Sequence, residues 1–294
     1  MGSVTTIPVD SWTHAPSARD QECAQDALEN GRVLLFPSLP FLLSDRERRF
    51  LNPDCSDGKS KNISFDPRTG AVNGSALAGE ELRQLAAMMA RFSGAAHALV
   101  TTLFPHYLSG LTLARTSYRP VAIDKRPTSY RKDDRRLHAD AFPSQPNHGD
   151  RILRVFTNIN PEGRPRVWHI GEPFPEFAAK FLGRTRRSIP GEAWLLYRLG
   201  ITRALRSEYD ALMLQLHDRA KGDTEYQAHA PQEEFAFPAG ASWVAFTDQV
   251  LHAATAGQYA LEQTFLVDVG VMRDPARAPL CILEGLTGRR LVAR

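Results

Sequence analysis

The feature that most constrains this chain is a His-x-Asp triplet, His138-Ala139-Asp140, together with a further histidine far downstream, His252. Alternate residues of a strand point to the same side, so His138 and Asp140 can reach one metal ion while Ala139 faces away. Two imidazoles and one carboxylate on one face of a metal leave the opposite positions open, which is typical of non-haem Fe(II) oxygenases. Short motifs also arise by chance. The alternative is a surface pair at His138 and Asp140, with His252 as a hydrogen-bonded core histidine.

The distance between the two parts of this motif predicts a β-rich fold. His252 lies 112 positions after Asp140, which leaves room for several antiparallel strands, and it follows an apolar run at 241–251 that indicates a strand and a turn. A jelly roll would bring both segments to one end of its barrel. We therefore expect a mainly β protein with flanking helices (α+β), built on a double-stranded β-helix, the jelly-roll core of cupin-like proteins.

Four segments carry a resemblance to a known family. They are His138–Pro146 (HADAFPSQP), Arg151–Pro161 (RILRVFTNINP), Arg166–Glu172 (RVWHIGE) and Val250–Phe265 (VLHAATAGQYALEQTF). Together they resemble the bacterial Kdo hydroxylases, over most of the chain and most strongly from about residue 130 to 265. The resemblance implies an Fe(II)- and 2-oxoglutarate-dependent dioxygenase that hydroxylates carbon 3 of 3-deoxy-D-manno-oct-2-ulosonic acid (Kdo) in Kdo-lipid A of lipopolysaccharide, converting Kdo to Ko and releasing succinate and CO2.

The same resemblance implies the cofactors and the catalytic residues. Iron would be held by His138, Asp140 and His252, with 2-oxoglutarate and O2 as co-substrates. Ascorbate would support activity by keeping the iron ferrous, although no residue in the sequence indicates a need for ascorbate. Two other hypotheses stay open at this stage: another 2-oxoglutarate hydroxylase, such as one acting on a peptidyl side chain, and a non-catalytic jelly-roll module that binds an anionic glycan.

The position of the 2-oxoglutarate anchor departs from the pattern of many relatives. Those proteins carry an arginine or lysine on the strand after the distal histidine, whereas no Lys or Arg occurs here between His252 and Arg273. We expect Arg154 to bind the distal carboxylate, because strand alternation places it on one face with Asn158 and close in sequence to the metal motif. The alternative is a solvent-facing arginine.

Four further residues are predicted to contribute to the same co-substrate site. Arg166 is the second candidate for the carboxylate anchor. Gln263 and Thr264 carry amide and hydroxyl groups that suit a carboxylate, and Asn158 shares the strand face of Arg154.

A run of basic residues leads up to the metal motif: Arg115, Arg119, Lys125, Arg126, Arg131, Lys132, Arg135 and Arg136. Such a run is usually a solvated face, but at the mouth of the site it would attract an anionic substrate. Guanidinium groups bind sugar carboxylates and phosphates in bidentate fashion. Arg131, Arg135 and Arg136, with His148 in the next loop, are therefore predicted to contact substrate. A second cluster, Arg184, Arg186 and Arg187, is interpreted as a loop.

Length and composition fit one globular domain of 294 residues, with a helical and loop portion at about 1–110 buttressing the core at about 111–294. No apolar run is long enough to span a membrane, and the first residues lack the pattern of a secretory signal. Three cysteines without Cys-x-x-Cys spacing favour a reducing cytoplasm. We expect a cytoplasmic enzyme with peripheral contact to the inner membrane face and no nucleic-acid partner, since no recognition element accompanies the net charge of +3. The oligomeric state is not indicated.

Periodicity and capping residues predict the main elements. Helices are expected at 17–30, 80–100 and 207–221, and strands at 32–36, 152–159, 166–170, 242–246, 264–271 and 280–283, with a polar loop at 52–73. Trp168, Trp194 and Trp243 are expected to pack in the core.

Overall fold

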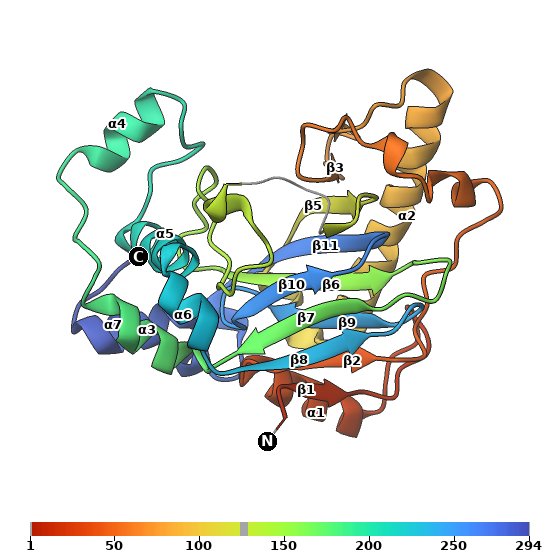
Figure 1. The fold of residues 1–294 in the computed structure, drawn as a ribbon. Helices are drawn as coiled ribbons and strands as arrows, with labels where there is room; N and C mark the ends of the chain where they lie inside the picture. Colours follow the sequence, from red (N-terminus) through yellow and green to blue (C-terminus); the bar gives the residue numbers. More distant parts are fainter. Residues whose placement is uncertain (1, 124–128, 294) are drawn as a thin grey trace.

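The computed structural model describes residues 2–123 and 129–293, so Lys125 and Arg126 of the basic run lie outside the described residues. Its main feature is an eight-stranded sheet in the order β1-β2-β9-β6-β11-β5-β3-β4 (Figure 1). All neighbours are antiparallel except β1 and β2. The strands are β1 (Val4–Thr6), β2 (Val33–Phe36), β3 (Ile63–Phe65), β4 (Val72–Asn73), β5 (Leu111–Arg119), β6 (Arg151–Asn158), β9 (Ser242–Phe246) and β11 (Ala260–Val267).

A second sheet faces the first and has three antiparallel strands in the order β10-β7-β8. These are β7 (Arg166–Gly171), β8 (Gln232–Phe237) and β10 (His252–Ala256). An aromatic cluster fills the space between the sheets. The Trp243 ring stacks on Phe237 and Phe156 at centroid distances of 4.3 and 5.2 Å, and Trp168 meets Phe156 edge-on. Burial of these large rings holds the two sheets together.

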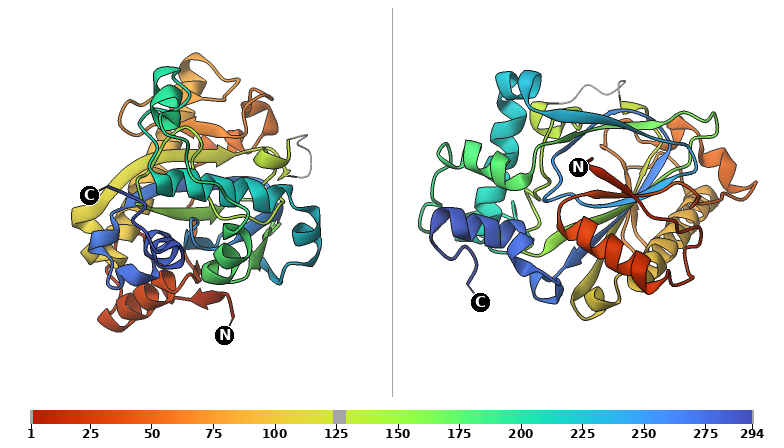
Figure 2. Two further views of the ribbon diagram at one scale, coloured as in Figure 1. Left: turned by 90° about the vertical axis from the view of Figure 1, so that its left-hand side faces the viewer. Right: turned by 90° about the horizontal axis from the view of Figure 1, so that it is seen from below.

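Two helices cover the other face of the large sheet: α1 (Ala18–Glu29) and α2 (Gly79–Leu103) (Figure 2). Their apolar stripes, which include Leu28 and Phe92, share one core with Val155, Leu261 and Phe265 of the sheet. This arrangement follows the sequence directly, because a helix with one apolar face must bury it against another element.

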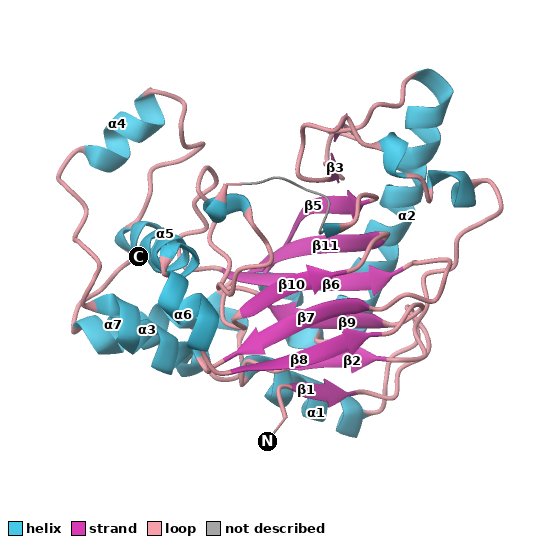
Figure 3. Ribbon diagram, viewed as in Figure 1, coloured by secondary structure: helices cyan, strands magenta, loops and turns pink. Residues whose placement is uncertain are grey.

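The remaining helices gather at one end of the sheets (Figure 3). They are α3 (Phe174–Leu182), α4 (Glu192–Arg198), α5 (Glu208–Gly222), α6 (Thr224–His229) and α7 (Pro279–Thr287). Helix α5 begins at Ser207, which forms a capping box with Asp210. Short 3₁₀ helices occupy Glu47–Phe50, Pro53–Cys55, Pro105–Gly110, Tyr130–Lys132, Val269–Val271 and Pro275–Arg277. None of the helices within the described parts of the chain is long and apolar enough to cross a bilayer.

Most predicted elements are present. Ser17 caps α1, α2 and α5 match the other two predicted helices to within three residues, and β2, β6, β7 and β9 match four predicted strands. The strand predicted at 264–271 instead begins at Ala260 and ends at Val267.

Two predictions were wrong. Residues 280–283 belong to helix α7, which Pro279 begins at its first position, and Trp194 is 60% exposed on α4 while Trp168 and Trp243 are buried. An apolar run of four residues suits a strand and a buried helix equally well, so its pattern could not decide. The polar stretch at 52–73, predicted as a loop, also contains the short strands β3 and β4.

Candidate metal centre

The predicted metal motif is brought together by backbone hydrogen bonds between its two parts. His138 donates its N–H to the carbonyl of His252 (3.1 Å), and His252 donates to the carbonyl of His138 (2.9 Å). Asp140 donates its N–H to Thr247 (2.8 Å). The prediction that His138 and Asp140 lie on a strand needs correction, because His138 forms a single bridge to the first residue of β10. The alternation nevertheless holds, since Ala139 packs into the separate core beneath α3 and α5.

Both imidazoles are fixed by a second hydrogen bond. Nδ1 of His138 lies 2.7 Å from the carbonyl of Arg136, and Nδ1 of His252 lies 2.9 Å from that of Val250. A carbonyl only accepts, so each Nδ1 carries the proton and each Nε2 keeps its lone pair for a metal. The Trp168 ring stacks on His252 at 5.0 Å and fixes the plane of that imidazole.

The three side chains fit a divalent iron ion. One ligand atom from each of His138, Asp140 and His252 lies within 4.8 Å of the others. Oδ2 of Asp140 is buried and accepts no hydrogen bond, although the Arg154 guanidinium lies 3.1 Å from it. Burial lowers the pKa of His138 to about 3 and also lowers that of His252, so both rings are neutral donors at neutral pH. Burial opposes ionisation of Asp140, but Arg154 and the imidazoles outweigh it and hold its pKa well below the ordinary value. Two neutral imidazoles and one carboxylate are the donor set of the facial triad.

A charge cluster that is largely buried, except for Lys61, adjoins the triad. Arg154 on β6 reaches Asp140 Oδ2 (3.1 Å) and Glu262 Oε1 on β11 (2.6 Å). The other oxygen of Glu262 accepts from Arg119 on β5 (2.9 Å). Arg119 also pairs with Asp134 (3.1 Å), which in turn pairs with Lys61 (2.6 Å). The cluster thus joins Lys61, Arg119 and Arg154 to Asp134, Asp140 and Glu262.

The structure places Arg154 beside the metal motif, as its predicted role requires. Glu262 was missed, and Arg119 was predicted only as one of the basic residues that lead up to the metal motif. A signal for Glu262 was present: it stands in a strand that is otherwise largely apolar, where a buried carboxylate needs a cationic partner. Burial raises the pKa of Glu262, but Arg154 and Arg119 outweigh it and lower that pKa overall. The cluster is therefore ionised.

The other predicted co-substrate residues divide into two groups. Thr264 pairs with Arg154 in the β11–β6 register, and Arg166 shares its face of β7 with Trp168, the residue that stacks on His252. Gln263 and Asn158 have other roles. Gln263 alternates onto the α2 side of the sheet, where it accepts a hydrogen bond from Thr116. The Asn158 amide donates to two backbone carbonyls. Their positions give no support to the predicted contacts.

The predicted substrate residues lie in loops around the centre, and most already have partners. Arg131 pairs with Asp218 (3.0 Å) and Arg135 with Asp133 (2.8 Å), while Arg136 donates to the carbonyl of Lys221. His148, at a backbone φ of 52°, lies 3.6 Å from Asp210. Their contacts with substrate stay a prediction.

Helix α5 contributes two side chains on the metal side that the sequence did not assign. His217 meets the ring of His138 edge-on at 5.3 Å and bonds to Asp218 through Nδ1 (2.9 Å). Lys221 is 1% exposed, and burial lowers its pKa to about 8. Their i, i+4 spacing places both on one face of the helix, a signal that was present in the sequence.

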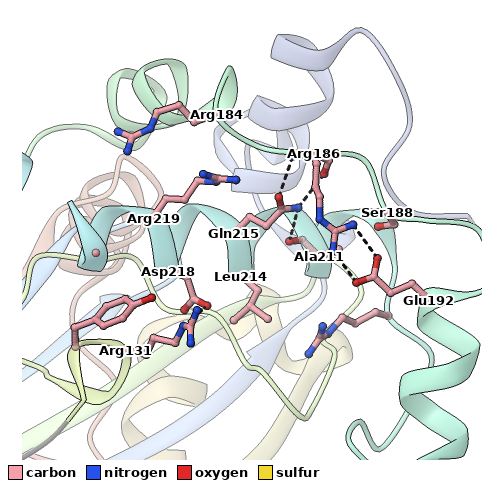
Figure 4. A pocket seen from close by; sticks show the side chains of 13 residues that line it. Arg131, Arg184, Arg186, Ser188, Glu192, Ala211, Leu214, Gln215, Asp218 and Arg219 are labelled. Atoms are coloured by element: carbon pink, nitrogen blue, oxygen red, sulfur yellow. Dashed lines mark hydrogen bonds and ion pairs between the residues drawn. The ribbon is translucent and has the colours of Figure 1, made fainter.

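An arginine-rich cavity of about 510 Å³ lies beside α5 (Figure 4). Five guanidinium groups line it, from Arg131, Arg184, Arg186, Arg206 and Arg219, together with the carboxylates of Glu192 and Asp218. Asp218 connects the cavity to the metal centre, because it bonds to His217, which contacts His138.

Two facing, mainly antiparallel sheets with two histidines and one carboxylate gathered at their edge are typical of the non-haem Fe(II) oxygenases. Residues 11–290 match the family of 3-deoxy-D-manno-oct-2-ulosonic acid (Kdo) hydroxylases. The chain belongs to this family.

Solved structures of the Kdo hydroxylase KdoO, a non-haem Fe(II) α-ketoglutarate-dependent dioxygenase, are closely similar. The complex with α-ketoglutarate and Fe(III) superposes with a TM-score of 0.95 at 46% identity, covering 99% of this chain and 98% of that one. The complex with succinate and Fe(III) gives the same values. The apo structure has a TM-score of 0.95 at 47% identity with equal coverage. No curated protein sequence matched the chain. This similarity disfavours the hypothesis of a non-catalytic glycan-binding module.

Proposed function

We propose that this protein hydroxylates carbon 3 of Kdo in Kdo-lipid A, converting Kdo to Ko. The observation that carries the proposal is the His138, Asp140 and His252 triad in a chain that belongs to the Kdo hydroxylase family. Iron held by these three residues, together with 2-oxoglutarate and O2, supplies an oxidant that places one oxygen atom in a substrate C–H bond and the other in succinate, with release of CO2.

The charges around the centre suit this set of cofactors. Three cationic side chains, Lys61, Arg119 and Arg154, balance the three carboxylates of Asp134, Asp140 and Glu262. The cluster is neutral by itself, and a divalent cation together with the dianion 2-oxoglutarate would leave it neutral. Arg154 supplies the guanidinium closest to the triad, and Arg166 remains the second candidate anchor for the distal carboxylate.

The two sheets support the finer part of the fold prediction, a double-stranded β-helix. The three-stranded sheet packs over the large one through the aromatic cluster, and the triad lies at the end where β10 begins. A single domain is supported by the core beneath α1 and α2, to which both the N-terminal portion and β6, β9 and β11 contribute side chains. The domain boundaries at about 1–110 and 111–294 belong to the proposal.

Kdo-lipid A is a membrane lipid, so the proposal includes a cytoplasmic protein that contacts the inner membrane face peripherally. Attraction by Arg131, Lys132, Arg135 and Arg136 would contribute, although pairing with Asp218 and Asp133 reduces the free charge of the three arginines.

The test is reconstitution with Fe(II), 2-oxoglutarate, O2 and Kdo-lipid A, followed by acid release and mass analysis of the sugar. The proposal predicts Ko and an equimolar amount of succinate. Succinate formed without any change in the sugar would place the substrate elsewhere, with a peptidyl side chain as the next candidate.

A further inference from the structure

A single segment carries most of the large apolar side chains that are exposed within the described residues. Of the eleven large apolar side chains that are exposed within the described residues, seven lie between positions 189 and 205: Ile189, Trp194, Leu195, Tyr197, Leu199, Ile201 and Leu205. We call residues 184–206 the α4 arm. Helix α4 buries none of its residues, and Figures 1 and 2 show it standing away from the sheets on two loops. An exposed apolar surface of this kind marks a place where the protein meets a partner.

The α4 arm is also strongly basic. It contains six arginines, Arg184, Arg186, Arg187, Arg198, Arg203 and Arg206, against one carboxylate, Glu192, which pairs with Arg186. Trp194 and Tyr197 are side chains with an apolar body and a polar tip, which suits the boundary between water and lipid. Apolar and basic side chains combined on a short exposed helix are typical of a segment that lies in the interface of an anionic bilayer.

The arm also forms one wall of the arginine-rich cavity. Arg184, Arg186 and Arg206 come from the arm, and Arg131 and Arg219 come from the body of the protein. The Nε groups of Arg206 and Arg219 are buried without a hydrogen-bond partner. Arg206 also donates to the carbonyl of Pro143 through Nη2. The other three lining arginines have carboxylate partners: Arg131 pairs with Asp218, Arg184 with Asp223 and Arg186 with Glu192. The two unpaired N–H groups and the surplus positive charge of the cavity suit a phosphate group of a lipid.

We propose that the α4 arm is the membrane-docking element of this protein, inserting its apolar side chains into an anionic bilayer while the adjoining arginine cavity binds lipid phosphates. The inference rests on the proposed function, which places the reactive sugar on a membrane lipid. It also explains the position of the arm. Asp218 lines the cavity and bonds to His217, and His217 contacts His138 of the metal centre.

A second copy of the chain is a less suitable occupant of this surface. A two-fold interface would bring the same patch of each copy together and place the arginines of one arm against those of the other. Anionic lipid headgroups neutralise those charges instead.

The test uses the full-length protein and vesicles of phosphatidylglycerol and phosphatidylethanolamine that contain no Kdo. The triple variant Trp194→Ser, Leu195→Ser, Leu199→Ser is expected to bind at least about a hundredfold more weakly, because burying each apolar side chain is worth roughly a factor of ten or more. The matched control, Leu42→Ser, Leu108→Ser, Leu286→Ser, removes three leucines that are also exposed but lie elsewhere, and should bind like the unmodified protein. Equal binding by the triple variant and the unmodified protein, or equal loss in the control, would overturn the proposal.

Trp194 gives a direct measure of insertion. Lipids brominated in their acyl chains should quench a component of the tryptophan fluorescence that is missing in Trp194→Phe. Quenching that is identical in the two proteins would show that the arm stays out of the bilayer. A triple variant that loses self-association in sedimentation, and keeps its binding to vesicles, would assign the arm to a second copy instead.

Activity separates this proposal from the proposed function. The triple variant should hydroxylate a water-soluble Kdo saccharide at the rate of the unmodified protein and lose turnover only on Kdo-lipid A in vesicles. If the unmodified protein hydroxylates neither substrate, the proposed function fails, whatever the vesicles show. If the triple variant matches it on both substrates, docking by the α4 arm fails and the proposed function stands.

Discussion

The guanidinium of Arg154 lies 3.1 Å from Oδ2 of Asp140, so the predicted co-substrate anchor contacts a predicted metal ligand directly. The same guanidinium pairs with Glu262 at 2.6 Å. In the proposed site, Arg154 would therefore influence both the carboxylate predicted to hold iron and the predicted binding of 2-oxoglutarate.

Replacement of Arg154 by Ala should raise the apparent KM for 2-oxoglutarate by about ten- to a hundredfold, because a charge-assisted contact is worth roughly 1.5–3 kcal/mol. Steady-state kinetics at saturating iron measures this, and a Co(II) titration of the same variant separates a weakened metal site from a weakened co-substrate site. Arg166→Ala is the matched variant. An unchanged KM in Arg154→Ala, with a raised KM in Arg166→Ala, would move the anchor to β7.

Single replacement of His138, Asp140 or His252 by Ala should abolish turnover and leave the fold largely intact, since all three lie at the edge of the sheets where β10 begins. Succinate release measures the first effect and circular dichroism the second. Full activity in any one of the three variants would show that the ligand assignment is wrong.

The metal triad could be predicted from sequence for two reasons. Its residue types, two histidines and one aspartate, are themselves metal ligands, and the first two ligands are only two positions apart in the chain. The charge cluster could not, because Glu262 and Arg119 meet only through the β11–β5 pairing, which joins positions 143 apart. His217 was missed for a similar reason: its spacing from Lys221 places both residues on one face of α5, but only the packing of that helix brings His217 to His138.

Local patterns also misjudged the environment of some residues. Trp194 has the large apolar side chain of a typical core residue, but it is 60% exposed. Gln263 lies on the face of its strand that points to α2. A pattern along the chain indicates whether a segment forms a helix or a strand. It does not indicate which other elements pack against each face of that segment.

The buried pair of Arg151 and Asp248 should be important for stability. Their side chains lie 2.8 Å apart with essentially no exposure, and Arg151 also donates to Gln249. Asp248→Ala would leave a buried guanidinium without its carboxylate, which typically costs about 3–5 kcal/mol. Urea unfolding of the metal-free protein measures this loss. The double variant Arg151→Met, Asp248→Leu should recover part of it, and a single variant as stable as the unmodified protein would contradict the estimate.

Acid should destabilise the metal-free protein through the charge cluster. The pKa values of Asp134 and Glu262 are lowered in the folded state, because their cationic partners outweigh the opposing effect of burial. The unfolded chain therefore binds more protons below about pH 4, near the ordinary carboxyl pKa values. Their stabilisation is fully present above that pH and is lost as the pH falls.

Thermal unfolding between about pH 6 and pH 3 measures this dependence, with a slope of up to about 1.4 kcal/mol per pH unit for each group. Asp134→Asn should show a shallower slope than the unmodified protein. An equal slope in the two proteins would exclude Asp134 as a source of the acid sensitivity.

The central claim is that oxygen from O2 enters the Kdo sugar at a centre held by His138, Asp140 and His252. The most direct measurement is mass analysis of Kdo-lipid A after reaction under isotopically heavy O2. The account predicts one heavy oxygen atom at carbon 3 of Kdo and one in succinate, with neither label in the His252→Ala protein. Hydroxylated Kdo that carries oxygen from water, or labelled succinate beside an unchanged sugar, would contradict it.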